Sequence, residues 1–201
     1  MTTAIILCAG SSTRFSAGKK NKTLQLINGK PIFMYSLEKF KAFGLESVIL
    51  VVKENERELF EKFIHDLKNI RFAIGGKRRQ DSVLNALKLL KDDEKVLIHD
   101  GARPLVNHGV IKRVVEKISP NVCVVPVIPS EDALRIQKNG KLYYLDRRNV
   151  FRIQTPQGCF VGELRQLYEE FKDIDFYDDA AAFEKKGLKV MGVDGDKKTS
   201  K

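Results

Sequence analysis

Short apolar runs alternate with amphipathic stretches along most of this 201-residue chain, and that alternation constrains its fold more than any other feature. Five runs are almost continuously apolar, as strands buried on both faces of a sheet are: 4–7, 48–52, 72–74, 96–98 and 122–127. Stretches with helical spacing separate them, at 31–43, 56–67, 82–90 and 109–118. The pattern predicts an α/β fold with a largely parallel sheet and helices on both faces.

Several residues indicate where these helices begin and end. Pro31 suits the first turn of a helix, where its missing N–H has no intrahelical partner, and Gly44 suits the end of that helix. Asp81 precedes the helix expected from Ser82 and can cap it, and Asn107 can cap the following one.

The alternation stops after Pro129. The polar stretch 133–150 carries the turn signal Asn139-Gly140 between two short strand-like segments, which predicts an inserted β-hairpin. A hairpin alone is marginally stable in water, so we expect it to pack on something, such as a second subunit. The sequence shows no repeat or linker, and we predict one domain over residues 1–201 with a β-arm at about 131–152.

Composition narrows the possible partners and compartments. The hydrophobic fraction of 43% is that of a packed soluble protein, and the net charge of +10 favours a polyanionic partner without choosing among them. The three cysteines are far apart and lack the spacing of a metal site, which fits reduced thiols in a cytoplasmic protein. There is neither a cleavable signal nor an apolar run of about 18 residues, so we expect no membrane partner.

The loop after the first strand is the most informative part of the sequence. In parallel α/β sheets, ligands bind outside the carboxyl ends of the strands. Residues 9–22 provide small side chains, which let backbone N–H groups approach phosphates, followed by lysines that can neutralise them. The loop matches neither the P-loop nor the GxGxxG fingerprint, and a plain surface turn is the alternative. Its position after the first strand favours phosphate binding.

Two further loops follow strands. Residues 75–82 combine two glycines, three basic residues and a helix N-terminus, which suit an anion or a base edge. Asp100 ends a buried strand and is a candidate ligand for Mg²⁺, with a helix cap as the alternative, whereas His99 is expected to be structural. No serine–histidine–acid set is present, which fits phosphoryl or nucleotidyl transfer, where positioning and charge neutralisation supply most of the catalysis.

Four motifs taken in order resemble those of the 2-C-methyl-D-erythritol 4-phosphate cytidylyltransferases. They are Ala9-Gly10-Ser11-Ser12-Thr13-Arg14 with Lys22, Gly75-Gly76 to Asp81-Ser82-Val83, His99-Asp100-Gly101-Ala102-Arg103-Pro104, and Thr155-Pro156-Gln157. The resemblance implies a Rossmann-like nucleotidyltransferase fold and a homodimer joined by β-arms. It also implies the reaction of CTP with methylerythritol phosphate to give the CDP-alcohol and pyrophosphate, in non-mevalonate isoprenoid biosynthesis.

The resemblance also implies roles for individual residues. Arg14, Lys22 and Lys201 would act on the phosphates in catalysis. The residues that would bind CTP are Ala9, Gly10, Gly76, Ser82, Asp100 and Gly101, and Asp100 would also bind Mg²⁺ or another divalent cation. Arg103 would bind the methylerythritol phosphate together with Arg147 and Thr155 of a partner's arm, with Arg148 as the alternative to Arg147.

The chain departs from the family pattern in the arm, where Asp132-Ala133 replaces Asp-Thr, and at Tyr177, where a threonine is usual. The C-terminal helix that the family carries after the last active-site lysine is also missing after Lys201. A cytidylyltransferase for ribitol 5-phosphate or another polyol phosphate is the nearest alternative function. A non-catalytic nucleotide- or RNA-binding protein is a different class, but RNA binding predicts stacking aromatics on a basic face that the sequence lacks, so we expect no nucleic-acid partner.

Overall fold

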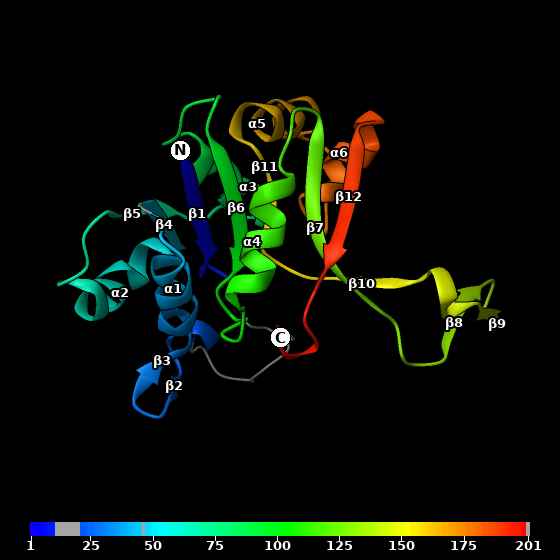
Figure 1. Ribbon diagram of the computed structural model, residues 1–201, viewed down its shortest axis with the longest axis horizontal. Coiled ribbons are helices and arrows are strands. Elements are labelled where there is room, and N and C mark those ends of the chain that lie inside the picture. The colour runs from blue at the N-terminus through cyan, green and yellow to red at the C-terminus, as the bar shows by residue number, and fades with distance from the viewer. Residues whose placement is uncertain (11–20, 46, 200–201) are drawn as a thin grey trace.

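A computed structural model describes residues 1–10, 21–45 and 47–199 of the chain. Within these ranges one mixed sheet has the strand order β10-β7-β11-β6-β1-β4-β5, with β12 paired to β7 (Figure 1). Its strands are β1 (Thr2–Leu7), β4 (Ser47–Val52), β5 (Ile70–Ile74), β6 (Lys95–Asp100), β7 (Val122–Pro129), β10 (Phe151–Ile153), β11 (Gln157–Phe160) and β12 (Lys189–Asp194). The five predicted apolar strands are confirmed as β1, β4, β5, β6 and β7.

Most of the sheet is parallel, as predicted. β1 runs parallel to β4 and β6, β4 is parallel to β5, and β7 is parallel to β12. Ile5 of β1 stands opposite Ile49 on one side and Ile98 on the other. β11 is antiparallel to both β6 and β7, and β10 is antiparallel to β7. The carboxyl ends of β1, β4, β5 and β6 therefore lie along one edge of the sheet.

Helices cover both faces of this sheet (Figure 1). They are α1 (Ile32–Ala42), α2 (Arg57–Ile64), α3 (Arg79–Leu87), α4 (His108–Lys117), α5 (Val161–Glu170) and α6 (Ala180–Lys186). Ile6 of β1 packs in a core with Phe40 of α1, whereas its neighbour Ile5 packs in a second core with Leu87 of α3 and Phe183 of α6. Because successive strand residues point to opposite faces, two buried faces require a continuously apolar strand.

Helix boundaries agree with the sequence in two places and differ in two. Gly44 adopts φ +93° just after α1, and the Asn107 side chain accepts the Val110 N–H at 2.9 Å and caps α4, as expected. Pro31 precedes α1 in an extended conformation rather than standing in its first turn. The prediction that Asp81 caps a helix from Ser82 is wrong, because α3 begins at Arg79 and the Asp81 carboxylate reaches back to the Arg78 N–H.

An antiparallel hairpin interrupts the chain between β7 and β10. It consists of β8 (Leu134–Lys138) and β9 (Lys141–Leu145), which form a two-stranded sheet of their own. Asn139 and Gly140 both have positive φ, as a type I′ turn requires. Figure 1 shows this hairpin at the far right, extending away from the main sheet and its helices.

The smaller elements are the strand pair β2 (Leu26–Ile27) and β3 (Lys30–Pro31) and the 3₁₀ turns η1 (Lys22–Leu24), η2 (Glu54–Glu56), η3 (Arg147–Asn149) and η4 (Lys197–Thr199). Cys8, Cys123 and Cys159 are buried and unbridged, in agreement with the expectation of reduced thiols. Among the helices in the described ranges, none has the length and apolar character needed to cross a membrane.

Candidate active site

Three loops converge at the carboxyl edge of the sheet. Backbone hydrogen bonds connect them to neighbouring strand ends: the Cys8 N–H donates to Val51, the Gly75 N–H to Val52 and the Gly101 N–H to Leu7, at 2.8, 2.9 and 3.0 Å. The loops that follow β1 and β5 are thus both bonded to the end of β4, and the loop that follows β6 is bonded to the end of β1. The described ends of the three segments that the sequence predicted to bind a ligand therefore lie side by side.

Two glycines allow this close approach. A Cβ on Gly75 would stand 2.4 Å from the Cβ of Ala9, and a Cβ on Gly101 would stand 2.7 Å from the Cys8 sulfur and 3.0 Å from the Leu7 carbonyl oxygen. Neither space admits a side chain without moving the end of β1. Glycine is therefore required by packing between loops at these positions, and neither residue has a positive φ.

Residues on both sides of the first loop are well defined. Ala9 and Gly10 follow the end of β1, and a Cβ on Gly10 would meet no atom within 4 Å. Asn21 is buried, and its amide donates to the Cys8 carbonyl and to Glu56, each at 2.7 Å. Asn21 thereby fixes the start of η1, whose first residue is Lys22. Arg14 lies outside the described residues.

The second loop is shaped by Ser82. Its hydroxyl accepts the Gly76 N–H at 2.9 Å and donates to the Arg78 carbonyl at 3.2 Å. Asp81 accepts from the Arg78 backbone and from its guanidinium, with a shortest distance of 2.7 Å. Gly76 and Ser82, predicted to face the base, thus lie together beside the first turn of α3.

Asp100 stands between two arginines at the end of β6. Arg103 approaches one carboxylate oxygen at 3.2 Å and Arg79 approaches the other at 3.7 Å. Arg103 also donates to the Thr199 carbonyl at 3.0 Å, which brings the C-terminal segment to the same place. Lys201 lies outside the described residues. The structure thus gathers the predicted residues Asp100, Gly101 and Arg103.

His99 and Thr155 form hydrogen bonds to the backbone at Asp100 and Arg103. Burial lowers the pKa of His99 to about 4, so its ring is neutral. Its Nε2–H donates to the Arg103 carbonyl at 3.1 Å, and its Nδ1 accepts the Thr155 hydroxyl at 3.0 Å. The same Thr155 oxygen accepts the Asp100 N–H at 3.2 Å. His99 is structural, as expected.

The position of Thr155 corrects one prediction. It was expected to act on a neighbouring subunit from the arm, together with Arg147. Instead Thr155 is buried in the main body, between β10 and β11, and its hydroxyl contacts His99 and Asp100 of its own chain. Thr155 is thus part of the main body and not of the arm, because strand β11, which follows it, pairs with β6.

A buried ion pair beside Asp100 was missed by the sequence analysis. Asp179 is fully buried and receives two hydrogen bonds from Arg79, both at 2.8 Å, and one from the Tyr168 hydroxyl at 2.6 Å. Gln157 accepts the backbone N–H groups of Asp179 and Ala180. One hundred residues separate Arg79 from Asp179 in the sequence, and no local pattern indicates their contact.

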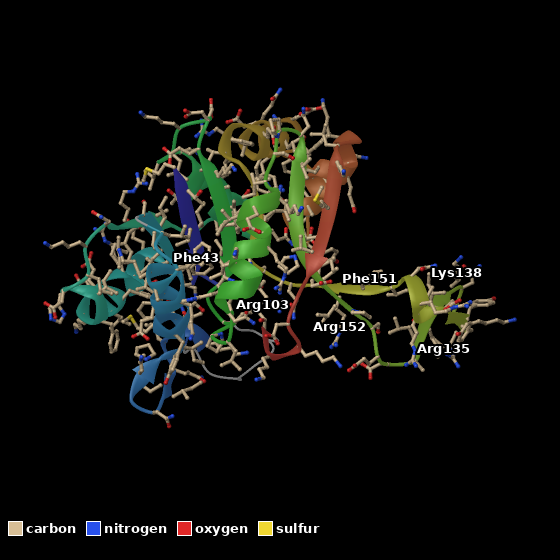
Figure 2. All side chains as sticks on the ribbon, in the orientation of Figure 1. Phe43, Arg103, Arg135, Lys138, Phe151 and Arg152 are labelled. Atoms are coloured by element: carbon tan, nitrogen blue, oxygen red, sulfur yellow. The ribbon has the colours of Figure 1, made fainter. Side chains whose placement is uncertain are left out.

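The two candidate arginines of the arm have different partners. Arg148 pairs with Asp146, and its side chain is 85% exposed. Arg147 donates to the Glu131 carbonyl oxygen, a neutral acceptor, and lies next to the root of the hairpin. Figure 2 shows Arg152 and Phe151 near this root and Arg135 and Lys138 further along the hairpin.

The described residues contain no group of three His, Cys, Asp or Glu side chains that could hold a metal ion. Asp100 contributes one carboxylate at the end of β6. This fits Mg²⁺ bound largely by substrate phosphates and water, because that ion often takes one or two carboxylates from the protein.

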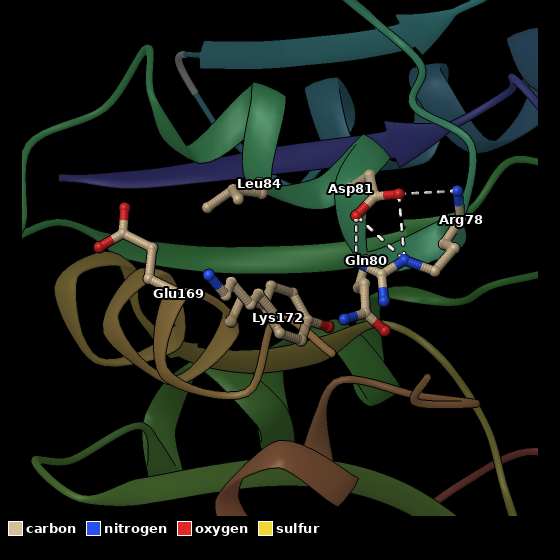
Figure 3. Close-up of a pocket in the computed structure, with 7 residues that line it drawn as sticks. Arg78, Gln80, Asp81, Leu84, Glu169 and Lys172 are labelled. Atoms are coloured by element: carbon tan, nitrogen blue, oxygen red, sulfur yellow. Dashed lines mark hydrogen bonds and ion pairs between the residues drawn. The ribbon is translucent and has the colours of Figure 1, made fainter. Parts of the chain in front are cut away.

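A separate hollow of about 280 Å³ lies between α3 and α5 (Figure 3). Arg78, Gln80, Leu84 and Tyr168 are among the residues that line it. Of the predicted site residues within the described ranges, none lines this hollow. We therefore place the candidate active site at the three converging loops.

Comparisons with known proteins identify the family of this chain. Residues 2–201 match the family described as 2-C-methyl-D-erythritol 4-phosphate cytidylyltransferase. An enzyme of that name from Bacillus cytotoxicus is 38% identical over 97% of this chain and 89% of its own. A bifunctional IspD/IspF enzyme from Pelagibacter ubique is 32% identical over 98% of this chain and 53% of its own.

Solved structures show the same fold. The 4-diphosphocytidyl-2C-methyl-D-erythritol synthase of Anaerococcus prevotii superposes with a TM-score of 0.86, at 24% identity over 100% of this chain and 89% of that one. The 2-C-methyl-D-erythritol 4-phosphate cytidylyltransferase of Francisella tularensis gives 0.81, at 26% identity over 100% of this chain and 93% of that one.

Proposed function

The chain belongs to the 2-C-methyl-D-erythritol 4-phosphate cytidylyltransferase family, and we propose how its residues carry out the reaction of that family. It is a nucleotidyltransferase of isoprenoid biosynthesis that converts CTP and 2-C-methyl-D-erythritol 4-phosphate to 4-diphosphocytidyl-2-C-methyl-D-erythritol and pyrophosphate. A phosphate oxygen of the alcohol phosphate attacks the α-phosphorus of CTP. The bond from that phosphorus to the pyrophosphate oxygen breaks, and pyrophosphate leaves with the electron pair.

The observation that carries the proposal is the convergence of three loops on Asp100 and Arg103. In our proposal, backbone N–H groups near Ala9 and Gly10 meet the triphosphate. Gly76 and Ser82 lie beside the cytosine, because their loop follows β5, two strands from β1 along the same sheet edge. Asp100 and Gly101 meet the ribose and the phosphates. No covalent intermediate is required, since positioning and charge neutralisation account for most catalysis in such transfers.

Cationic side chains stabilise the negative charge that develops on the phosphates in the transition state. We assign this role to Lys22, together with Arg14 and Lys201 outside the described residues. Lys22 is suited to it because Asn21, held to Cys8 and Glu56, fixes the point from which it projects. Asp100 is the residue that would hold Mg²⁺, which when bound neutralises phosphate charge.

The alcohol phosphate has its own set of residues. Arg103 and Thr155 lie beside Asp100 in the same chain. Arg147 of the partner subunit completes this set in our proposal, and its preference over Arg148 rests on the ion pair between Arg148 and Asp146. Ala133 and the fully exposed Tyr177 stand where the family pattern has threonines, so they are the positions at which alcohol specificity can differ.

A homodimer joined through the hairpins accompanies this arrangement. The hairpin exposes several large apolar side chains, namely Ile136, Leu142, Tyr143 and Tyr144. Leu142 and Tyr144 are 69% and 70% exposed. Apolar groups exposed on an isolated two-stranded sheet are typical of a surface that a partner covers.

The test is a pyrophosphate-release assay with magnesium over four nucleoside triphosphates and two acceptors, methylerythritol phosphate and ribitol 5-phosphate. We expect release with CTP and methylerythritol phosphate at least about tenfold faster than with any other pair, because the base and alcohol contacts should each discriminate by about 1.4 kcal/mol or more. Equal or faster release with ribitol 5-phosphate would assign the chain to a different alcohol. Absence of release with CTP would reject the assignment of residues to a nucleotidyl transfer.

A further inference from the structure

We propose that Arg79 is a positioning residue for Asp100, held in place by the buried carboxylate of Asp179. The inference rests on the proposed role of Asp100 in binding CTP. Arg79 opens α3, and its two terminal nitrogens each donate to one Asp179 oxygen at 2.8 Å. Its Nε lies 3.7 Å from an oxygen of Asp100. One guanidinium thus spans both carboxylates.

Asp179 is a rigid support for that guanidinium. Its side chain is fully buried, and the Tyr168 hydroxyl donates to it at 2.6 Å in addition to the two bonds from Arg79. Gln157 holds its backbone N–H at 2.9 Å. A buried carboxylate with three donors and a fixed backbone leaves the arginine one orientation, because rotation would leave the charge uncompensated.

The guanidinium itself is stabilised by this pair. Burial acts against its charge, but the charge and hydrogen bonds of Asp179, with a smaller contribution from Asp100, raise the pKa of Arg79 above its ordinary value. The side chain of Arg79 is 24% exposed and that of Asp100 is 15% exposed. Arg79 is therefore a permanent cation beside Asp100.

Asp100 is then fixed from two sides. Arg79 from α3 faces one carboxylate oxygen, and Arg103 from the loop after β6 faces the other. The Asp100 N–H is bound to Thr155. Two arginines that face different oxygens of Asp100 define the plane of its carboxylate, whereas one arginine facing one oxygen does not. Lysine cannot replace Arg79, because its N–H groups all lie on one nitrogen and do not form the rigid planar fork of a guanidinium.

The competing explanation is that Arg79 merely neutralises Asp179. The two explanations differ in what happens when both charges are removed. The double variant Arg79→Gln/Asp179→Asn keeps a hydrogen-bonded pair without buried charge, so its stability to urea should stay close to that of the wild type. A positioning role predicts that this folded double variant still binds CTP roughly 10- to 100-fold more weakly, as removal of groups that orient a ligating residue does.

The decisive experiment is a double-mutant cycle with Arg79→Lys and Asp100→Asn, read out by calorimetric CTP binding without added metal and by kcat/KM with magnesium. If Arg79 acts through Asp100, Arg79→Lys should weaken CTP binding by roughly 10-fold or more in the wild-type background and by less than about threefold in the Asp100→Asn background. Arg57→Lys is the matched control, because it makes the same substitution at an exposed arginine of α2 that pairs with Glu61. We expect CTP binding and kcat/KM within about twofold of wild type for it.

Equal losses in both backgrounds would overturn the proposal, because Arg79 would then act independently of Asp100. Wild-type CTP binding by Arg79→Gln/Asp179→Asn would overturn it as well and would leave the role of Asp100 intact. If Asp100→Asn alone binds CTP and turns over as the wild type does, the proposed role of Asp100 fails and the positioning role fails with it. The cycle thus separates the two failures.

Discussion

Two nitrogen atoms, one of His99 and one of Asp100, are hydrogen-bonded to the Thr155 hydroxyl. It donates to Nδ1 of His99 and accepts the backbone N–H of Asp100. These bonds fix the His99 tautomer, whose Nε2–H then holds the Arg103 carbonyl. A single buried hydroxyl therefore connects the end of β6 to the loop that carries Arg103. Its loss would affect the positions of both Asp100 and Arg103.

Replacement of Lys22 by alanine should reduce turnover and leave folding stability nearly unchanged. The side chain is expected to stabilise charge that develops in the transition state, and loss of one such contact typically costs about 10²–10³ in rate. Pyrophosphate release and urea unfolding measure the two effects. Lys91→Ala removes the same charge from an exposed turn before the amino end of β6 and serves as the control. A Lys22→Ala protein with full turnover would exclude Lys22 from the mechanism.

Asp100→Asn should abolish most magnesium-dependent activity and leave the protein folded. The amide keeps the shape of the carboxylate but not the charge that a hard cation requires. The amide also weakens the contacts with Arg79 and Arg103. Turnover measured against magnesium concentration, together with circular dichroism, tests this. Near-normal activity at low magnesium would contradict the metal-binding role.

Individual site residues were predictable where a motif contains them and hidden where a contact spans the chain. The order of loops along the sequence was enough to place Asp100, Gly101 and Arg103 at one sheet edge. Asn21 and Arg79 were missed, because their partners Glu56 and Asp179 lie 35 and 100 residues away. A polar residue flanked by charges gives no sign in sequence that its side chain is buried.

At the level of elements, the start of α3 depends on a reciprocal contact between Arg78 and Asp81. Hydrogen bonds from the Arg78 side chain, and then its backbone N–H, lower the pKa of Asp81. The carboxylate thus stabilises the native protein while it is ionised. That contribution is complete above the ordinary aspartate pKa of about 3.9 and is lost as the pH falls through the lower native value.

Asp81→Ala should therefore destabilise the protein by about 1 kcal/mol at pH 7, as loss of a helix cap does. Urea unfolding at pH 7 and at pH 3 measures the difference between variant and wild type. We expect the difference to shrink at the lower pH, because the wild-type carboxylate becomes protonated. Asp81→Asn retains an acceptor and should lose less. A difference that is the same at both pH values would contradict the charge-assisted cap.

The parallel part of the sheet was predictable from its continuous apolar strands, and the antiparallel insertion was not. β11 is four residues long and contributes Cys159 to a core, but its sequence has no turn or alternation that marks a strand between β6 and β7. The helix α5 could have been predicted, since Val161, Leu164, Leu167 and Tyr168 are buried at helical spacing. The missed insertion is also the reason that Thr155 was expected in the arm, whereas it lies in the main body.

At the scale of the whole molecule, the hairpin is the feature that the main body does not explain. β8 and β9 pair with each other, whereas the strands around them join the main sheet. Lys197 pairs with Glu131 at the root of the hairpin, so the C-terminal segment and the hairpin are connected. A second copy that covers the exposed apolar side chains would place a basic hairpin near the site of its partner. This arrangement predicts that catalysis requires two chains.

Mixing two variants with different defects tests this requirement. Arg147→Ala should raise the KM for methylerythritol phosphate and leave the KM for CTP nearly unchanged, whereas Lys22→Ala should lower kcat. In a mixed dimer, the chain with Arg147→Ala has its own Lys22 and receives Arg147 of the partner subunit, so one site is intact and the other has both defects. Random exchange of equal amounts should restore about a quarter of the wild-type rate at limiting methylerythritol phosphate.

Thr155→Val provides the matched control for this experiment, because Thr155 belongs to the site of its own chain. In a mixed dimer of Thr155→Val and Lys22→Ala, each site keeps one defect, so activity should not return. Subunit exchange is verified by mass spectrometry with one chain isotopically labelled. Recovery in both mixtures, or in neither when exchange is complete, would contradict a site shared through Arg147. A fully active monomer in sedimentation at assay concentration would contradict it directly, because a monomer has no partner to supply the arginine.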